Sequence, residues 1–381
     1  MTTRPVSIFV HSLIFILALI LTAGLINTAF PPFKTPQGLG DVSVKFQYFT
    51  EHKDDYDLIF LGPSTTYHGV TPKLFDELMT ANGNKVKSFN LGIPGANVAE
   101  MDFYLQKVLD LKPAKLKWIF LDCVFDIFNE KEDPTATKNV YWHTPVKTIE
   151  NFRLIFESTR SLPVKIKAFY TNFISFLYNW FGIGDFSNFW QQREEVLANG
   201  ISEDKLVQEA GYYAIDWMDN GEKRKKVFLS NYGETYQQRL GKAKEVVSEQ
   251  ENIYTYPLTD YGIKIFKTLV SKVYALEKTT KIKAEPIFLI APTLHPEVGH
   301  SASAVIKAFE LGYIPTLFDF INPNKFPTFY EMSNRIDDLH LNHQGAQEYT
   351  YSLAAKFSEY LNLSQQEESN QPLISQSYPQ S

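Results

Sequence analysis

Short apolar runs alternate with stretches of helical spacing along much of this chain. An apolar run of four to eight residues bounded by charge or glycine is typical of a buried strand, and apolar residues every three or four positions are typical of an amphipathic helix. The predicted strands are 56–62, 85–93, 116–125, 284–292 and 316–322, and the predicted helices are 72–82, 99–111 and 343–362. Strands separated by helices form parallel βαβ units, so the pattern predicts an α/β fold in three layers, a parallel sheet covered on both faces.

The start of the chain carries a different pattern, one long apolar run. No charged residue lies between Arg4 and Lys34, and most of residues 7–30 are apolar. Because about 20 apolar residues cross a bilayer as a helix, residues 1–30 are predicted to be a transmembrane anchor. The positive charge before the run favours a cytoplasmic N-terminus, which places the rest of the chain outside the cytoplasm. A cleaved signal peptide is the alternative, although "NTAFPP" is a poor cleavage site.

Composition divides the rest of the chain. Residues 31–50 begin with a Pro- and Gly-rich stretch and are predicted to be a linker, and residues 51–362 form the folded domain. A helical, aromatic-rich insertion interrupts that domain at about 130–255, and the Gln- and Ser-rich tail 363–381 is predicted to be disordered. Three interpretations of the insertion stay open: a subdomain with its own core, a lid over a site, or a surface that rests on a membrane.

Charge and motif content exclude several function classes. The net charge of −6 argues against nucleic-acid binding, which needs a basic face. The single cysteine, Cys123, allows no internal disulfide and is predicted to be a buried strand residue. No metal or cofactor is predicted, because the chain has no Walker loop, HExxH, CxxC or EF-hand loop, and the glycine loop at 91–96 lacks the third glycine of a dinucleotide site.

Two stretches that follow predicted strands could carry chemistry. In "FLGPSTTYHG" (60–69), Ser64 lies just past a strand, at the sheet end where open α/β sheets bind ligands. Ser64 is either a nucleophile or an ordinary cap of the next helix. In "FNLGIPGAN" (89–97), the glycines allow backbone N–H groups to approach a ligand, as in an oxyanion hole, or they simply form a turn.

A third stretch, "RIDDLHLNHQGAQEYT" (335–350), supplies a base and a carboxylate. Asp337 and His340 are three residues apart, so one short turn can hold both. A carboxylate that orients an imidazole, which then takes a proton from a serine, is the general arrangement of nucleophilic catalysis. Asp338 is the rival orienting group, and a polar turn residue is the alternative role of His340. The chain order of Ser64, a glycine loop and D-x-x-H before the last helix favours the catalytic interpretation.

This ordered set of stretches resembles the SGNH (GDSL-like) hydrolases. The similarity is greatest to the membrane-anchored bacterial subgroup linked to acyl transfer onto surface polysaccharides, such as the alginate O-acetyltransferases. It covers residues 57–125 and 284–362 and leaves the insertion outside. The resemblance implies a flavodoxin-like three-layer domain.

The resemblance also implies residue roles. Ser64 would be the nucleophile, and His340, oriented by Asp337, the general base. The N–H groups of Ser64 and Gly95 would donate to the oxyanion, whereas Gly92 matches the position of that donor less well. His68, Asn97 and His295 are weaker candidates, for substrate contact.

Two positions depart from the family pattern. Pro63 stands where the family has aspartate, but proline removes only its own N–H, so Ser64 keeps its donor. Where the family has an asparagine donor after the third strand, this chain has Asp126, and Asn129 follows a turn later. An ionised aspartate cannot donate. Either Asn129 donates, another group substitutes, or the hole lacks one donor, at a cost of roughly 3 kcal/mol of transition-state stabilisation.

The resemblance therefore implies a single-pass protein of the bacterial inner membrane with an extracytoplasmic domain. Its activity would be that of a serine esterase or O-acyltransferase, through an acyl-enzyme, on ester-linked acyl groups of a glycan. A multi-pass acyltransferase would be a partner. Two alternatives stay open: a catalytically degenerate protein that binds or assembles polysaccharide, and a lipid-facing esterase with residues 167–190 on the membrane.

Overall fold

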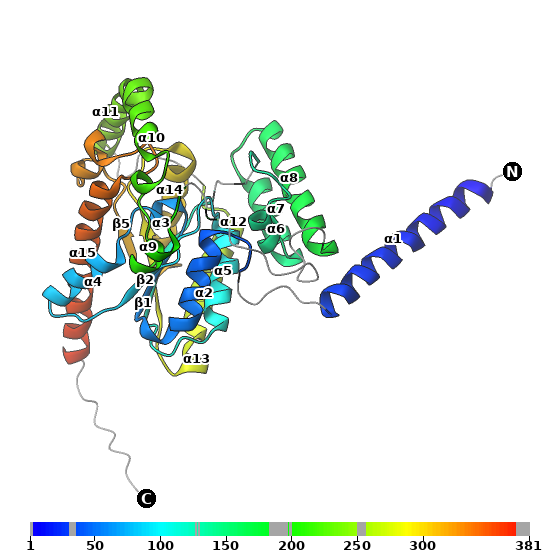
Figure 1. Cartoon of the computed structure of the whole chain (residues 1–381), viewed down its shortest axis with the longest axis horizontal. Coiled ribbons are helices and arrows are strands. Elements are labelled where there is room, and N and C mark those ends of the chain that lie inside the picture. The colour runs from blue at the N-terminus through cyan, green and yellow to red at the C-terminus, as the bar shows by residue number, and fades with distance from the viewer. Residues whose placement is uncertain are drawn as a thin grey trace, which may run out of the picture.

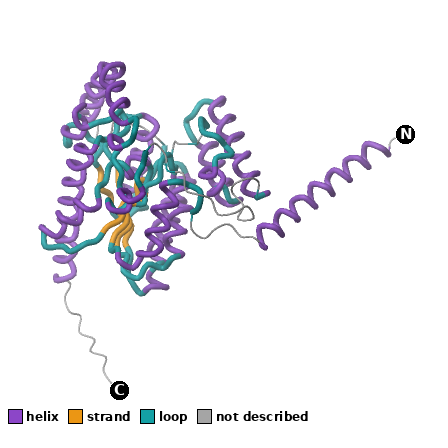
Figure 2. The backbone as a smooth tube through the Cα atoms, viewed as in Figure 1, coloured by secondary structure: helices purple, strands orange, loops and turns teal. Residues whose placement is uncertain are grey.

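A five-stranded sheet with all strands parallel forms the centre of the protein. The computed structural model describes residues 3–29, 36–125, 128, 130–182, 197, 200–249 and 257–370. The strands are β1 (Leu58–Leu61), β2 (Ser88–Asn90), β3 (Trp118–Asp122), β4 (Glu285–Ile290) and β5 (Leu317–Asp319). Their order in the sheet is β2-β1-β3-β4-β5, and Figure 2 shows them between two layers of helices. The predicted parallel α/β fold is confirmed, and each strand lies inside its predicted run.

Strand side chains alternate between two hydrophobic clusters, one on each face of the sheet. Ile59 and Leu61 of β1 point to one cluster, and Leu58 and Phe60 point to the other. The first cluster is covered by α2 (Asp41–His52), α5 (Val98–Asp110) and α12 (Asp260–Ala275), and the second by α4 (Pro72–Ala81) and α15 (His343–Asn370). Both faces are therefore dry, as the continuous apolar runs of the strands require.

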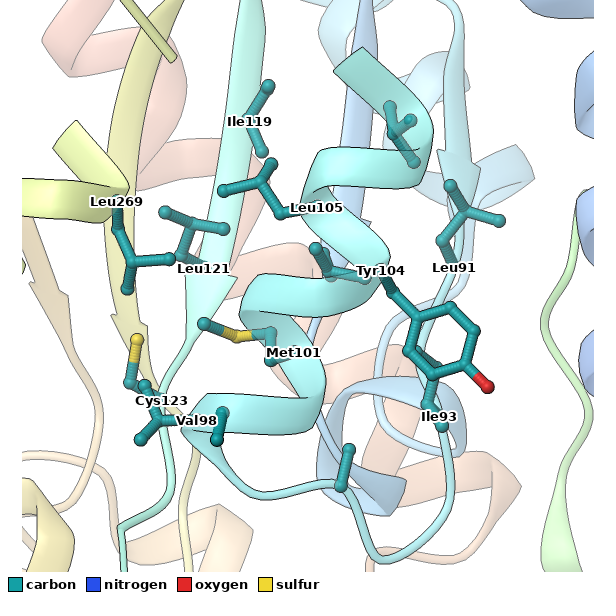
Figure 3. Packing of buried hydrophobic residues seen from close by; sticks show 14 of the residues in the cluster. Leu91, Ile93, Val98, Met101, Tyr104, Leu105, Ile119, Leu121, Cys123 and Leu269 are labelled. Atoms are coloured by element: carbon teal, nitrogen blue, oxygen red, sulfur yellow. The ribbon is translucent and has the colours of Figure 1, made fainter. Parts of the chain in front are cut away.

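Helix α5 shows how the first face is packed. Figure 3 shows Met101 and Leu105 of α5 next to Leu121 of β3, with Leu269 of α12 beside them. Met101 and Leu105 are four residues apart, which is the helical spacing that predicted this helix.

Helix α2 corrects the predicted linker. Residues 31–50 were predicted to connect the anchor to the domain, but α2 begins at Asp41 and buries Val42, Phe46 and Phe49. The positions 42, 46 and 49 have helical spacing, which the Pro- and Gly-rich start of the segment obscured. The linker interpretation is wrong from Asp41 onward.

The last helix corrects the predicted tail. Helix α15 continues to Asn370, so the prediction of disorder is wrong for residues 363–370. Residues 371–381 lie outside the described residues.

The insertion contributes helices to both sides of the domain. Its helices are α6 (Thr137–Trp142), α7 (Pro145–Glu157), α8 (Leu162–Phe181), α9 (Glu203–Gln208), α10 (Gly221–Val227) and α11 (Gly233–Glu249). Tyr141, Trp142 and Ile155 belong to the same cluster as the sheet residues Ile59 and Leu121. The interpretation of the insertion as a subdomain with a core of its own is therefore wrong.

Shorter elements complete the fold. The short helices are α3 (Ser64–Tyr67), α13 (Glu277–Thr280), the 3₁₀ turns η1 (Lys53–Asp55), η3 (Ile215–Trp217), η5 (Pro327–Tyr330) and η6 (Met332–Asn334), and the π-helical turn η4 (Phe228–Tyr232). Helix α14 (Pro296–Glu310) lies between β4 and β5 in the chain.

One N-terminal helix, α1 (Thr3–Ala29), is long and apolar enough to cross a membrane. The candidate span is Ser7–Ile26, with a mean hydropathy of 2.5, and 6% of it is buried. Figure 1 shows α1 projecting away from the body of the protein. The predicted apolar N-terminal helix is thus present, and its orientation in a membrane stays a prediction.

Candidate active site

Ser64 lies at the carboxyl end of β1, on the first residue of α3. The N-cap of α3 is Pro63, and no side chain caps this helix, so the Ser64 hydroxyl has no capping role. Ser64 is half-buried, whereas the other residues of α3 are buried. The Ser64 Oγ lies 2.8 Å from Nε2 of His340. The structure thus brings together two residues that are 276 positions apart in the chain.

The turn before α15 orients His340. Nδ1 of His340 lies 3.0 and 3.1 Å from the two carboxylate oxygens of Asp337. Oδ1 of Asp337 also accepts hydrogen bonds from the backbone N–H groups of Leu339 and His340. Because an ionised carboxylate only accepts, the imidazole proton is assigned to Nδ1, which leaves Nε2 to accept the proton of Ser64. Asp338, the rival orienting group, instead pairs with Arg239 at 2.8 Å.

Arg224 from helix α10 holds the same carboxylate. Its Nη2 donates to Oδ2 of Asp337 at 2.6 Å. Burial by itself disfavours ionisation of Asp337, but His340, the hydrogen bonds to the carboxylate and Arg224 outweigh burial and hold the pKa of Asp337 well below its usual range. Sequence reasoning missed Arg224, since it lies in a run of basic residues in the insertion, 113 positions from Asp337.

The site lies at the point of the sheet where ligands bind in doubly wound folds. The chain passes from β1 to β2 on one side and then to β3 on the other side of β1, so the order reverses between β1 and β3. Ser64 follows β1, and Asp122 ends β3 next to it. A crevice opens at the carboxyl ends of strands at such a reversal, which is why a serine and its partners can meet a ligand here.

Asp122 fixes the helix that carries Ser64. Its Oδ2 accepts hydrogen bonds from the hydroxyls of Thr65 and Thr66, at 2.8 and 3.0 Å. Gly62 makes this approach possible, because a Cβ there would lie 2.3 Å from Thr66 Oγ1 and 2.7 Å from Cβ of Asp122. Burial raises the pKa of Asp122 to about 6, although the two hydroxyls lower it. Sequence reasoning did not select Asp122, whose one signal was an acidic residue inside the predicted strand run 116–125.

Asp122 is expected to make the stability of the protein depend on pH. Its folded-state pKa of about 6 lies above the ordinary value of 3.8, so between roughly pH 4 and pH 6 the folded state binds more protons than the unfolded state. The free energy of unfolding therefore falls as the pH rises through this window and levels off above it, by a few kcal/mol at most from this group. Asp122→Asn keeps an acceptor for both threonines and should remove this part of the slope.

Chemical denaturation of both proteins at pH 4.5 and pH 7 measures the effect. The free energy of unfolding of the Asn variant minus that of the parent should be larger at pH 7 than at pH 4.5. An unchanged difference would show that the buried carboxyl does not take up a proton on folding in this range.

The glycine loop after β2 supplies a candidate oxyanion donor. Gly95 has φ of +68°, a conformation that favours glycine, and it lines the same cavity as Ser64. No described group accepts a hydrogen bond from the N–H of Ser64 or Gly95. The N–H of Gly92 is already engaged, since it donates to Oδ1 of Asn90 at 2.9 Å. Of the two glycines, Gly95 is therefore the one with a donor free for a ligand.

The predicted third donor is not placed. Asn129 and Asp126 both lie outside the described residues.

A cavity of about 450 Å³ opens over the serine. This volume is in the range of small-molecule sites. The charged residues on its wall are Asp41, Glu132, Lys138 and Arg224, and its apolar lining includes Leu39, Val42, Ile201, Ile215 and Met218. The insertion forms one side of the site, because it supplies Glu132, Lys138, Ile201, Ile215, Met218 and Arg224.

The three weaker candidates for substrate contact are placed differently. His68 lines the cavity, and its ring meets that of His340 edge-on at 5.8 Å between centroids. Burial lowers the pKa of His68 well below its usual value, and its Nδ1 lies 2.6 Å from the backbone oxygen of Tyr213. Asn97 is a buried helix cap, because its Oδ1 accepts from two N–H groups at the start of α5, and it is not among the described residues that line the cavity. His295 is not among the described residues that line the cavity.

Lys45 of α2 contacts the backbone of the glycine loop. Its ammonium group donates to the backbone oxygen of Gly92 and lies 3.5 Å from the centroid of the Tyr67 ring. Burial lowers the pKa of Lys45 to about 7, against the opposing effect of Asp41. Sequence reasoning missed Lys45, since its segment was assigned to a linker.

Within the described ranges, no three His, Cys, Asp or Glu side chains are grouped so as to hold a metal ion. A scan against models of known protein families and a search of curated proteins found no match to this chain.

Proposed function

We propose that this protein is a membrane-anchored serine esterase or O-acyltransferase of the SGNH type. One observation carries the proposal, the continuous contact from Ser64 Oγ to His340 Nε2 and from His340 Nδ1 to Asp337. A nucleophile, a base and an orienting carboxylate in hydrogen-bond reach are the working parts of acyl transfer. The placement of Ser64 after β1 and of the D-x-x-H turn before the last helix supports the SGNH assignment.

The first half-reaction forms an acyl-enzyme. Ser64 Oγ attacks the carbonyl carbon of an ester while Nε2 of His340 takes the hydroxyl proton. The N–H groups of Ser64 and Gly95 donate to the oxygen that becomes negative. Collapse of the tetrahedral intermediate breaks the ester bond, and His340 returns the proton to the leaving alcohol.

The second half-reaction decides between hydrolysis and transfer. Nε2 of His340 takes a proton from water or from a sugar hydroxyl, which attacks the acyl-serine, and the proton then returns to Ser64. Transfer requires that the acceptor competes with water in the cavity. The polar and charged wall, with Asp41, Glu132, Lys138 and Arg224, is suited to a hydroxyl-rich glycan acceptor.

The anchor sets the cellular context of the proposal. Helix α1 would hold the domain on the outer face of a bacterial inner membrane, since the positive charge precedes the span. An acyl group taken from cytoplasmic metabolism would have to cross this membrane, which is the task of a multi-pass acyltransferase partner.

Covalent labelling of the full-length protein in detergent micelles tests the proposed nucleophile. After reaction with a fluorophosphonate, intact mass should increase by one adduct, and peptide mass analysis should place that adduct on Ser64. A folded protein that stays unlabelled, or that is labelled at another residue, contradicts the proposal and favours a protein that binds glycan without an acyl-enzyme.

A further inference from the structure

Helix α8 is amphipathic in the opposite sense to an ordinary surface helix. The side that packs against the protein buries four polar residues, Thr171, Asn172, Ser175 and Asn179, together with Ala168. On the other side, Leu162, Ile166, Tyr170 and Phe173 are exposed to between 46% and 69%. Helices of water-soluble domains turn their apolar stripe inward, so α8 is arranged for an environment that is less polar than its own interior.

The buried side of α8 belongs to a connected polar network, which fixes the side of the helix that faces the protein. Oδ1 of Asn172 contacts His143 Nε2 at 2.6 Å and accepts from Asn151 Nδ2 at 2.8 Å. Its Nδ2 donates to the backbone oxygen of Phe128 at 2.9 Å. Turning the helix over would bury the apolar side chains but would leave these polar groups without partners, at a cost of about 1–3 kcal/mol each.

The neighbouring helix α7 exposes apolar residues as well. Val146, Ile149 and Phe156 have exposed fractions of 63%, 56% and 74% and lie along one side of α7, which also carries the exposed Arg153. We call these three residues, together with Leu162, Ile166, Tyr170 and Phe173, the α7–α8 apolar surface. Figure 1 shows α7 and α8 on the side of the molecule that faces α1, away from α15.

The contact between α1 and α8 fixes where this surface lies relative to a membrane. Helix α1 packs against α8. Among the described side chains of α1, Ala23 is buried and Gly24 half-buried, and the others are exposed. Ala23 lies inside the candidate span Ser7–Ile26, about 5 Å from its end at 1.5 Å per residue. A helix that touches the span at this depth is itself at the level of the membrane.

We propose that the α7–α8 apolar surface is inserted into lipid. The leaflet is the one in which the C-terminal end of the α1 span lies. Helix α8 is not among the described helices that are long and apolar enough to cross a membrane. It is therefore placed in the interface between lipid and water and does not cross the bilayer. Lys165 and Lys167 near its start and the half-buried Tyr178 and Trp180 near its end are side-chain types that settle at the headgroup level. The membrane therefore holds the domain by two contacts, the span and this surface.

Spin labels on the full-length chain in phosphatidylethanolamine–phosphatidylglycerol vesicles test the proposal. In a Cys123→Ser background, single cysteines replace Ile166 and Phe173, with Leu17 of α1 as the lipid reference and the exposed Leu311 as the water reference. Labels at Ile166 and Phe173 should resemble the label at Leu17, with frequent collisions with oxygen and severalfold fewer with a water-soluble nickel chelate than at Leu311.

Two results would overturn the proposal. Nickel collisions at Ile166 and Phe173 as frequent as at Leu311 would show a surface in water. Labels that are immobilised and shielded from both reagents would show that a protein, either a second copy or another membrane protein, covers the surface in place of lipid. The four labelled positions are exposed, so the labels should not disturb the fold. Cys123 is buried, so circular dichroism of the Cys123→Ser background against the parent checks that the fold persists.

Discussion

Replacing Ser64 by alanine is expected to lower the rate of p-nitrophenyl acetate hydrolysis by about 10⁴- to 10⁶-fold, the usual effect of removing the nucleophile of a serine triad. The hydroxyl is the atom that His340 Nε2 contacts at 2.8 Å, and no other described hydroxyl makes a hydrogen bond to that nitrogen. Steady-state hydrolysis by the purified full-length protein in detergent measures the loss.

The same variant should leave the fold intact. Because the Ser64 hydroxyl does not cap α3, its removal should change the free energy of unfolding by no more than about 0.5 kcal/mol. Thermal unfolding of the parent and the variant provides the control. An alanine variant that keeps its activity would assign the chemistry to another group, and a variant that unfolds would show that the serine is structural after all.

Replacing His340 by alanine is expected to cost nearly as much activity as replacing Ser64, because a serine hydroxyl is a weak nucleophile without an adjacent base. The double variant Ser64→Ala, His340→Ala should be no less active than either single variant, since the two residues act as one unit. Rates of fluorophosphonate labelling and of ester hydrolysis measure the effect of His340→Ala, which should reduce both.

His343 offers a matched control for His340. It is a histidine three residues later that contacts the Tyr212 hydroxyl at 3.0 Å, and it does not line the cavity over Ser64. His343→Gln should keep the rate within a few-fold of the parent. Equal losses in the two histidine variants would indicate a general disturbance of the turn before α15 and would remove the support for a base at His340. Additive losses in the double variant would likewise speak against a shared mechanism.

The sequence by itself predicted what depends on local pattern. Strand runs such as 56–62 and 116–125 are continuous because both faces of a parallel sheet are dry, so periodicity and bounding residues locate them without any knowledge of partners. The three-residue spacing of Asp337 and His340 lies within one turn, so their pairing was also readable. The position of Ser64 past a strand suggested where it would lie in the sheet.

Tertiary structure alone decided what depends on distant partners. Whether Ser64 is a cap or a candidate nucleophile is decided by His340, at a separation of 276 residues, and Arg224, Asp122 and Lys45 became part of the site through contacts that no local spacing encodes. The orientation of α8 is a similar case. The sequence pattern of a helix with one polar and one apolar side is the same whichever side is buried. Only the hydrogen-bond partners of Asn172 show that the apolar side of α8 faces outward. The spacing of apolar residues is fixed by the sequence, whereas the side of a helix that is buried depends on the groups that surround the helix.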